Sequence, residues 1–376
     1  MYISKYLSMK KNTSHKSKVI ELSELLDNKI KKNGSQLNKS RLNLMSMVII
    51  ALCKVQNVSF HKLAIAFDTE SKADSSLRRL QRFIASFQLC RDLIARLIFE
   101  LLPEKTNLKL VIDRTNWKFG EQNINIFMLG ITYRNVAFPL MFSMLNKKGN
   151  SNSKERIELI DRFIRLFGKE CIDCIMGDRE FVGEEWIDYL NVNGLRYYLR
   201  IRNNFKVYLP KKHESIPVNW MFSGLKIGEI RHYPRIVKVN GVYCYISGTL
   251  SQKRGEKTEL LIIISYNKNE QSFLNYKERW QIETCFRAMK SSGFDIENTH
   301  LKDVDRIEKL LNLVMISFIW CYKIGDYLDK YVRPITIKKH GHRAKSVFKY
   351  GLEYISNLLL NTQREDVVGV FSKNVM

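Results

Sequence analysis

The sequence has little proline and few acidic residues for its length, and each shortage excludes a class of protein. Only 6 of its 376 residues are proline and 45% are hydrophobic, which excludes a largely disordered chain and indicates packed cores. Aspartate and glutamate number 38 against 62 lysine and arginine residues, which gives a formal net charge of +24. The positive charge is spread over several segments. We therefore expect a nucleic acid as partner; the alternative is a soluble protein that is merely basic.

Paired cysteines and long apolar runs are also lacking. Of the 7 cysteines only Cys171 and Cys174 lie close together, and a zinc ribbon needs a second such pair. They precede an apolar run, so we interpret them as core residues. The most apolar stretch, 310–322, is too short to span a bilayer, and residues 1–18 lack the apolar core of a secretory signal. Scattered thiols in odd number favour the reducing cytoplasm, and no membrane partner is expected.

Hydrophobic periodicity divides the chain into three regions, of which the first and last are predicted to be helical. Residues 1–104 contain apolar repeats at helical spacing in 41–54 and 77–87, and the first hundred residues hold 18 basic against 8 acidic side chains. Short basic helices are typical of a helix-turn-helix DNA-binding region, but a plain bundle with a solvated basic face fits them equally. Residues 321–376 are predicted to form a basic helical C-terminal region.

The middle region, 105–320, alternates strand and helix patterns. Strand-like segments at 108–112, 123–130 and 137–145 are followed by a helix at 154–167 that Ser153 would cap, a strand at 172–176, a helix at 184–190 and a strand at 195–201. This order, β-β-β-α-β-α-β, predicts an α/β fold with a ribonuclease H-like core. Residues 202–258 form a glycine-punctuated, β-rich insertion. The 12 basic and 4 acidic residues between 200 and 260 suggest that it also contacts DNA.

Three carboxylates are placed for phosphoryl-transfer chemistry. Asp113 and Asp178 each end an apolar strand, and sheets of this kind collect ligands and metals at strand ends. Glu283 lies in a helix predicted over 275–291. Divalent cations stabilise the attacking and leaving oxygens in such reactions, and magnesium prefers carboxylates and water as ligands. Aspartate is also common in turns, so either aspartate alone is weak evidence.

The predicted helix surrounds Glu283 with groups that bind phosphate. Five residues recur at three- and four-residue steps and therefore share one face: Tyr276, Arg279, Glu283, Arg287 and Lys290. Apolar side chains are expected on the other side: Trp280, Ile282, Phe286 and Met289. Glu283 would hold metal, the three cations would bind phosphate oxygens, and Tyr276 would donate a hydrogen bond. The alternative is an exposed helix with ordinary ion pairs.

This pattern resembles a known signature. Tyr276-x2-Arg279-x3-Glu283-x6-Lys290 is similar to the Tyr-Arg-Glu-Lys motif of the DDE transposases of insertion sequence family 4. The strings Asp113-Arg114-Thr115 and Gly177-Asp178-Arg179-Glu180-Phe181 resemble that family's first and second aspartate motifs. The likeness extends to His342-Arg343-Ala344-Lys345-Ser346 and so covers roughly residues 108–350.

The resemblance implies a cut-and-paste DNA transposase with Asp113, Asp178 and Glu283 as catalytic metal ligands. It implies Mg2+, with Mn2+ as a substitute, and a homodimer bound to inverted-repeat ends and target DNA, associated with the nucleoid of a bacterial-type cell. Better-studied relatives stack a flipped base on a tryptophan of the insertion. Residues 250–270 contain none, and Trp220 lies well upstream. Two alternatives stay open, namely an inactive end-binding protein and a ribonuclease H-like nuclease without strand transfer.

Overall fold

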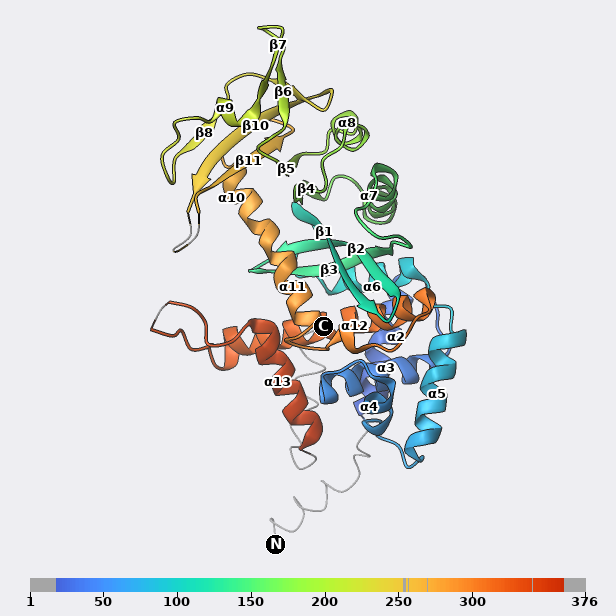
Figure 1. Ribbon diagram of the computed structural model, residues 1–376. Coiled ribbons are helices and arrows are strands. Elements are labelled where there is room, and N and C mark those ends of the chain that lie inside the picture. The colour runs from blue at the N-terminus through green and yellow to red at the C-terminus, as the bar shows by residue number, and fades with distance from the viewer. Residues whose placement is uncertain (1–17, 253–254, 256, 269, 340, 362–376) are drawn as a thin grey trace. The chain divides into compact units, whose positions relative to one another are not determined.

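Contacts within the chain divide it into two compact units. The computed structural model describes residues 18–252, 255, 257–268, 270–339 and 341–361 (Figure 1). One unit is Ile98–Glu308, and the other combines the described parts of Met1–Leu97 and Lys309–Met376. The ends of the predicted N- and C-terminal regions, 1–17 and 362–376, lie outside the described residues. Among those residues, no helix has the length and hydrophobicity needed to cross a membrane.

The second unit is helical, as the periodicity of both ends predicts. Its helices are α2 (Lys18–Lys32), α3 (Lys39–Val55), α4 (Phe60–Ile65), α5 (Ala73–Ser86), most of α6 (Arg91–Leu101) and of α12 (Val304–Tyr327), η3 (Leu328–Val332) and α13 (Val347–Leu360). The side chain of Asn38 caps α3, whose middle is buried on all sides.

Helices α12 and α13 cross each other in close contact at one glycine from each helix. A Cβ atom on Gly325 would lie 2.0 Å from the backbone oxygen of Val347, and one on Gly351 would lie 1.9 Å from that of Cys321. The two backbones therefore touch, which only glycine permits. This crossing fixes both ends of the segment that joins the helices.

The Ile98–Glu308 unit is built on one large sheet. Among the described residues its strands are β1 (Leu108–Phe119), β2 (Gln122–Tyr133), β3 (Val136–Met144), β4 (Ile172–Gly177), β5 (Tyr197–Ile201), β6 (Lys206–Leu209), β7 (Glu214–Pro217), β8 (Ile230–His232), β9 (Val237–Val239), β10 (Val242–Ser251) and β11 (Glu259–Ser265). Their order is β3-β2-β1-β4-β5-β11-β10-β9-β6-β7, with β8 on β10. The helices are α7 (Ser153–Phe167), α8 (Glu184–Val192), α9 (Val218–Met221), α10 (Ser272–Lys277), η1 (Glu278–Trp280), α11 (Gln281–Met289) and η2 (Ile296–Asn298).

The fold class predicted from the sequence is confirmed. Three antiparallel strands, β3, β2 and β1, lead into β4 and β5, which run parallel to β1, and helices flank this ribonuclease H-like core. The 202–258 insertion is β-rich as predicted. It does not form a separate sheet, because β11 pairs with β5 and β10 pairs with β11, so the central sheet continues into it.

Two local predictions differ from the structure. Ser153 was expected to cap the helix at 154–167, but the cap is Asn152: its side chain accepts from the Glu155 N–H, and the Glu155 carboxylate accepts from the Asn152 N–H. This reciprocal box satisfies two otherwise free N–H groups, which a lone serine cannot do. The helix expected over 275–291 is α10, a 3-10 turn and α11 in succession, and it ends at Met289.

Candidate active site

Asp113 and Asp178 sit beside each other at the end of the parallel ladder between β1 and β4. Asp113 was expected at the end of its strand, but β1 continues to Phe119 because β2 pairs with it along its whole length. The parallel pairing with β4 stops at Ile112 opposite Gly177. Each aspartate is thus the first residue beyond the last parallel pair. Its Oδ1 accepts a hydrogen bond of 2.7 Å from the next backbone N–H, that of Arg114 or Arg179.

Arg279 joins Asp113 to Glu283. Its Nη1 lies 3.4 Å from Asp113 Oδ2 and its Nη2 lies 2.8 Å from Glu283 Oε1. The guanidinium side chain is only 8% exposed, and it packs over the Tyr276 ring at 5.7 Å. The Tyr276 hydroxyl in turn lies 3.4 Å from Asp178 Oδ1. The α10–α11 segment therefore reaches all three carboxylates that the sequence singles out.

Burial dominates the electrostatics of this cluster. It raises the pKa of Asp113 to about 7, although the Arg114 N–H and the Arg279 charge act to lower it. The neighbouring carboxylates Glu180 and Asp178 raise it further. Burial likewise raises the pKa of the Tyr276 hydroxyl, which keeps it a neutral donor.

The two aspartate motifs are locked together by residues that sequence analysis did not single out. The Arg114 guanidinium makes two parallel contacts with the Glu180 carboxylate, Nε–Oε1 at 3.0 Å and Nη2–Oε2 at 3.1 Å. Such fork-to-fork pairs fix geometry as well as charge. Arg156 of α7 donates to the Glu180 backbone oxygen at 2.9 Å, and burial lowers its pKa to about 10. In the sequence, the sign of this role is that Arg156 stands on an otherwise apolar face of its helix.

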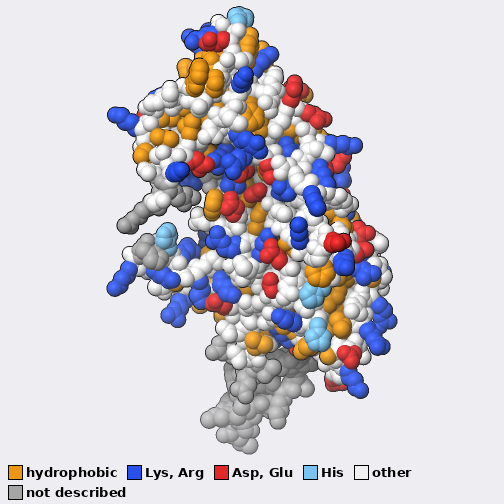
Figure 2. All heavy atoms as spheres, in the orientation of Figure 1, with side chains coloured by type: hydrophobic (Ala, Val, Ile, Leu, Met, Phe, Trp, Pro, Cys, Tyr) orange, Lys and Arg blue, Asp and Glu red, His pale blue; other side chains and the backbone are white. Residues whose placement is uncertain are grey.

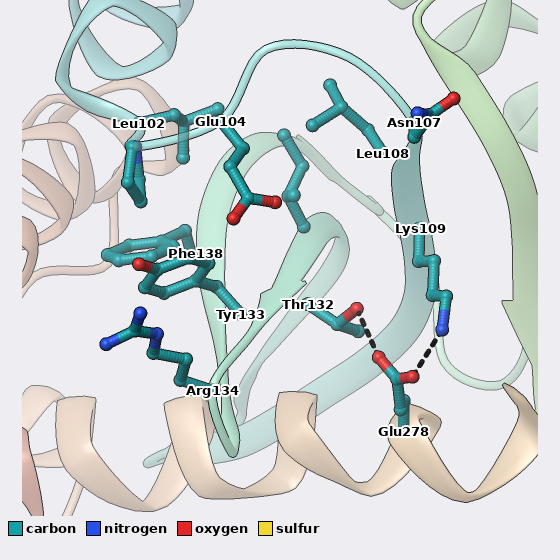
Figure 3. Close-up of a pocket in the computed structure, with 12 residues that line it drawn as sticks. Leu102, Glu104, Asn107, Leu108, Lys109, Thr132, Tyr133, Arg134, Phe138 and Glu278 are labelled. Carbon is teal, nitrogen blue, oxygen red and sulfur yellow. Dashed lines mark hydrogen bonds and ion pairs between the residues drawn. The ribbon is translucent and has the colours of Figure 1, made fainter. Parts of the chain in front are cut away.

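A second clamp holds the α10–α11 segment on the sheet. The Glu278 carboxylate accepts from Lys109 Nζ of β1 and, at 3.1 Å, from Thr132 Oγ1 of β2 (Figure 3). These residues line a cavity of about 260 Å³ that also contains Tyr133 and Phe138. None of the three predicted metal ligands lines this cavity. Glu278 therefore anchors the turn that carries Arg279, and its cavity is distinct from the carboxylate cluster.

The remaining predicted site residues, Arg287 and Lys290, follow Glu283 along the chain. Arg287 is exposed on α11. Lys290 follows the end of α11 as its cap residue, and its Nζ pairs with Glu297 at 2.7 Å. Of the side chains expected on the apolar side, Ile282, Phe286 and Met289 are buried, but Trp280 is 52% exposed. The 3-10 turn at 278–280 rotates it away from the position that a continuous α-helix would give it.

The three carboxylates are chemically suited to bind a divalent cation, although Arg279 contacts two of them in this structure. In the described part of the chain, no group of three or more His, Cys, Asp and Glu residues is assembled to hold a metal as it stands. Asp113 and Glu283 both turn an oxygen to the same guanidinium. Carboxylate oxygens are the ligands that Mg2+ prefers. The donor atoms are therefore of the kind that such an ion prefers, while in this structure Arg279 holds Asp113 and Glu283.

A ribonuclease H-like core with acidic residues at the end of its parallel ladder defines the class of the DDE enzymes. The family model described as transposase DDE domain matches residues 105–320, more than half of the chain, and the chain belongs to this family. It is a transposase whose partner is DNA, and transposases of this family generally use divalent metal ions. No curated protein matches the chain.

Among solved structures, the chain is similar to Marinitoga piezophila Argonaute, crystallised with a 5′-OH guide RNA and target DNA. The identity is 11% and the TM-score 0.21, over 55% of this chain. The match spans only 30% of the Argonaute chain. A likeness at that score supports no statement about fold or function.

Proposed function

We propose that the protein is a cut-and-paste transposase of the insertion sequence family 4 type. It cleaves phosphodiester bonds at inverted-repeat ends and joins the freed 3′ hydroxyls to target DNA, acting as a homodimer on paired ends. Asp113, Asp178 and Glu283 hold Mg2+, for which Mn2+ can substitute. Residues 1–104 form a DNA-binding region, 105–320 the catalytic domain with its insertion at 202–258, and 321–376 a basic C-terminal region.

One observation carries the proposal: a single turn of chain contacts all three carboxylates. Arg279 contacts Asp113 and Glu283, and Tyr276 approaches Asp178, although 170 positions separate the first carboxylate from the last. An exposed helix with ordinary ion pairs has no reason to reach two strands of the core. The three spacings of the Tyr-Arg-Glu-Lys pattern support the family 4 assignment.

The side chains divide the work between metal and phosphate. Bound cations supply charge stabilisation for the attacking and leaving oxygens. Asp113, Asp178 and Glu283 orient their oxygens toward these ions. Arg279 leaves the carboxylates and binds a phosphate oxygen when DNA enters, so the guanidinium is preorganised beside the reacting group. Tyr276, Arg287 and Lys290 bind neighbouring phosphates, and Lys290 exchanges Glu297 for one of them.

Glu283→Ala separates chemistry from binding. It removes a metal ligand and leaves the cations of the segment in place, so end-DNA affinity should stay at the wild-type level or rise. Cleavage should fall at least about a thousandfold, because metal-borne stabilisation supplies several kcal/mol of the barrier reduction. The measurements are gel-shift affinity across a salt series and single-turnover cleavage in Mg2+. Joining of precleaved ends to a plasmid tests strand transfer.

Glu270→Ala is the matched control, because Glu270 is exposed just before α10 and its loss changes the charge equally. If Glu283→Ala cleaves as well as this control, Glu283 is only an ion-pair partner. If it loses binding as completely as cutting, the carboxylate is structural and an end-binding role without chemistry is favoured. Wild-type cleavage without joining indicates a nuclease.

A further inference from the structure

A second charged feature lies outside the carboxylate cluster, in the segment that joins α12 and α13. Residues 333–339 and 341–345 form a two-stranded turn, the basic β-hairpin, which stands out beside α13 in Figure 1. Ile337 bridges Arg343 in antiparallel pairing. The Ala344 N–H donates to the Thr336 oxygen and the Lys338 N–H to the His342 oxygen, both at 2.8 Å.

The base of the basic β-hairpin is fixed while its arms are exposed. Asp329 accepts from the Ile335 N–H at 2.7 Å and from Arg343 Nη1 at 2.8 Å, so one carboxylate holds both arms. The Tyr350 hydroxyl of α13 donates to the Arg333 oxygen at 3.1 Å. Ile335 is buried, but every described residue from 336 to 346 is exposed. The arms therefore contribute nothing to a core, and a fixed base presents them to solvent.

The charge of this segment is of one sign. Residues 330–352 contain 7 lysines and arginines and no acidic residue. Arg343 and Lys345 are used internally, by Asp329 and Glu353. Among the described residues, the side chains of Arg333, Lys338 and Lys339 have no ion-pair partner. Like charges held together on a rigid turn repel one another, and an anionic ligand relieves that repulsion.

Many other cations of the chain have acidic side chains as neighbours. Figure 2 shows lysine and arginine side chains spread over the visible face, with acidic side chains among them. Lys302 and Arg306, for example, are exposed on either side of Asp303 and Asp305. The exposed cations on the arms of the basic β-hairpin have no acidic neighbours in sequence, and a fixed base holds these arms out to solvent.

We propose that the basic β-hairpin is a binding site for the phosphate backbone of duplex DNA. A two-stranded ribbon fits a major groove about 12 Å wide, and lysines on its arms then face phosphates on the groove walls. The site rests on the proposed function only in taking DNA as partner, and its binding needs neither the carboxylates nor metal. The duplex can be the end DNA or the target, and the two are separated by experiment.

The test is the double substitution Lys338→Gln with Lys339→Gln in the full-length protein. Binding is measured in EDTA across a salt series, with terminal DNA and with an unrelated duplex. The slope of log K against log salt should become shallower by about 1.8, because each released phosphate contact contributes about 0.9. Loss on the unrelated duplex alone assigns the site to target DNA, and loss on terminal DNA assigns it to the ends. Lys338→Arg with Lys339→Arg should bind as wild type.

The matched control is Lys302→Gln with Arg306→Gln, which removes the same charge beside acidic residues and should leave the slope unchanged. Equal losses in both variants would mean that only bulk charge matters and would overturn the site. An unchanged slope for the hairpin variant would also overturn the site. So would a hairpin variant that binds DNA as wild type does but loses binding to vesicles of phosphatidylcholine with 30% phosphatidylserine. The proposed function is tested separately, by measuring cleavage of terminal DNA with the hairpin variant at saturating protein concentration. If this cleavage persists while the hairpin variant shows no binding defect, the hairpin site fails and the proposed function stands.

Discussion

Charge is handled in opposite ways at the carboxylate cluster and on the basic β-hairpin. In the cluster, Asp113 and Glu283 share Arg279, and Glu180 is paired by Arg114. On the hairpin, exposed Lys338 and Lys339 have no ion-pair partner among the described residues. Buried charges without partners cost several kcal/mol, whereas exposed ones cost little. The comparison teaches that pairing is a requirement of burial, and that unpaired charge is tolerated where a ligand can reach it.

The same contrast predicts which site depends on metal. In the cluster, Asp113 and Glu283 are held by Arg279, which we propose turns to phosphate once metal replaces it, whereas the hairpin cations are exposed without metal. Each prediction below either breaks that contrast or measures its size.

The largest expected effect is that of the metal on cleavage. Mg2+ or Mn2+ should support cutting of end DNA, and chelator should abolish it, a change of at least about a thousandfold. Ca2+ should permit binding with little cutting, because its longer and looser coordination misplaces the reacting oxygens. The assay is single-turnover cleavage beside a gel shift in each ion. Undiminished cleavage in chelator would break the comparison, since the cluster would then function as the hairpin does, without metal.

A smaller effect is expected from unlocking the aspartate motifs. Arg114→Ala leaves the Glu180 carboxylate unpaired near Asp113, so the loop that carries Asp178 should shift. A displacement of about 1 Å at a reacting group costs roughly a hundredfold in rate. Glu180→Ala should cost less, and the double variant should cost less than the sum of the two, since the pair acts as a unit. Cleavage rates of the four proteins, with end-DNA affinity as the control, measure the coupling. Strict additivity would show that the pair does not position the site.

Much of the core could be predicted because its strands are uniform in pattern. Strands that are buried on both faces read as continuous apolar runs. The sequence therefore predicts nearly all of β4 and β5, and the buried first part of β1. The extension of β1 to Phe119 was not predicted, because Arg114 to Lys118 are mostly polar and follow an aspartate that looks like the end of a strand. Only the partner strand β2 reveals that the ladder continues.

The carboxylate cluster was predicted in its residues but not in its contacts. Tyr276, Arg279 and Glu283 follow from spacing, because three- and four-residue steps place side chains together on any helix. The 3-10 turn at 278–280, which exposes Trp280, depends on Glu278 being held by two strands distant in sequence. The Arg114–Glu180 lock likewise joins residues 66 positions apart. Local pattern contains no information on such pairs.

The smallest expected effect concerns the stability of the metal-free protein, and it tests the burial of Asp113. The pKa of its carboxyl is about 7 in the folded protein, against an ordinary value of 3.8. Because the folded value is the higher one, protonation favours the folded state. This contribution is fully present below about pH 4 and is lost as pH rises to about 7.

Asp113→Asn removes that titration and keeps an oxygen to accept from the Arg114 N–H. In EDTA, the melting temperature of the variant relative to wild type should therefore rise between about pH 4 and 7 and level off above. The shift from 3.8 to about 7 corresponds to roughly 4 kcal/mol, and 1 kcal/mol shifts the melting temperature of a domain of this size by roughly 2–4 °C, so a rise of about 10 °C is expected. Other carboxylates titrate equally in both proteins and cancel in the difference. Mg2+ should narrow the gap at pH 8 by stabilising the wild type alone. A difference that is constant across this pH range would mean that Asp113 is solvated like the hairpin cations, and the contrast between the two regions would fail at its central residue.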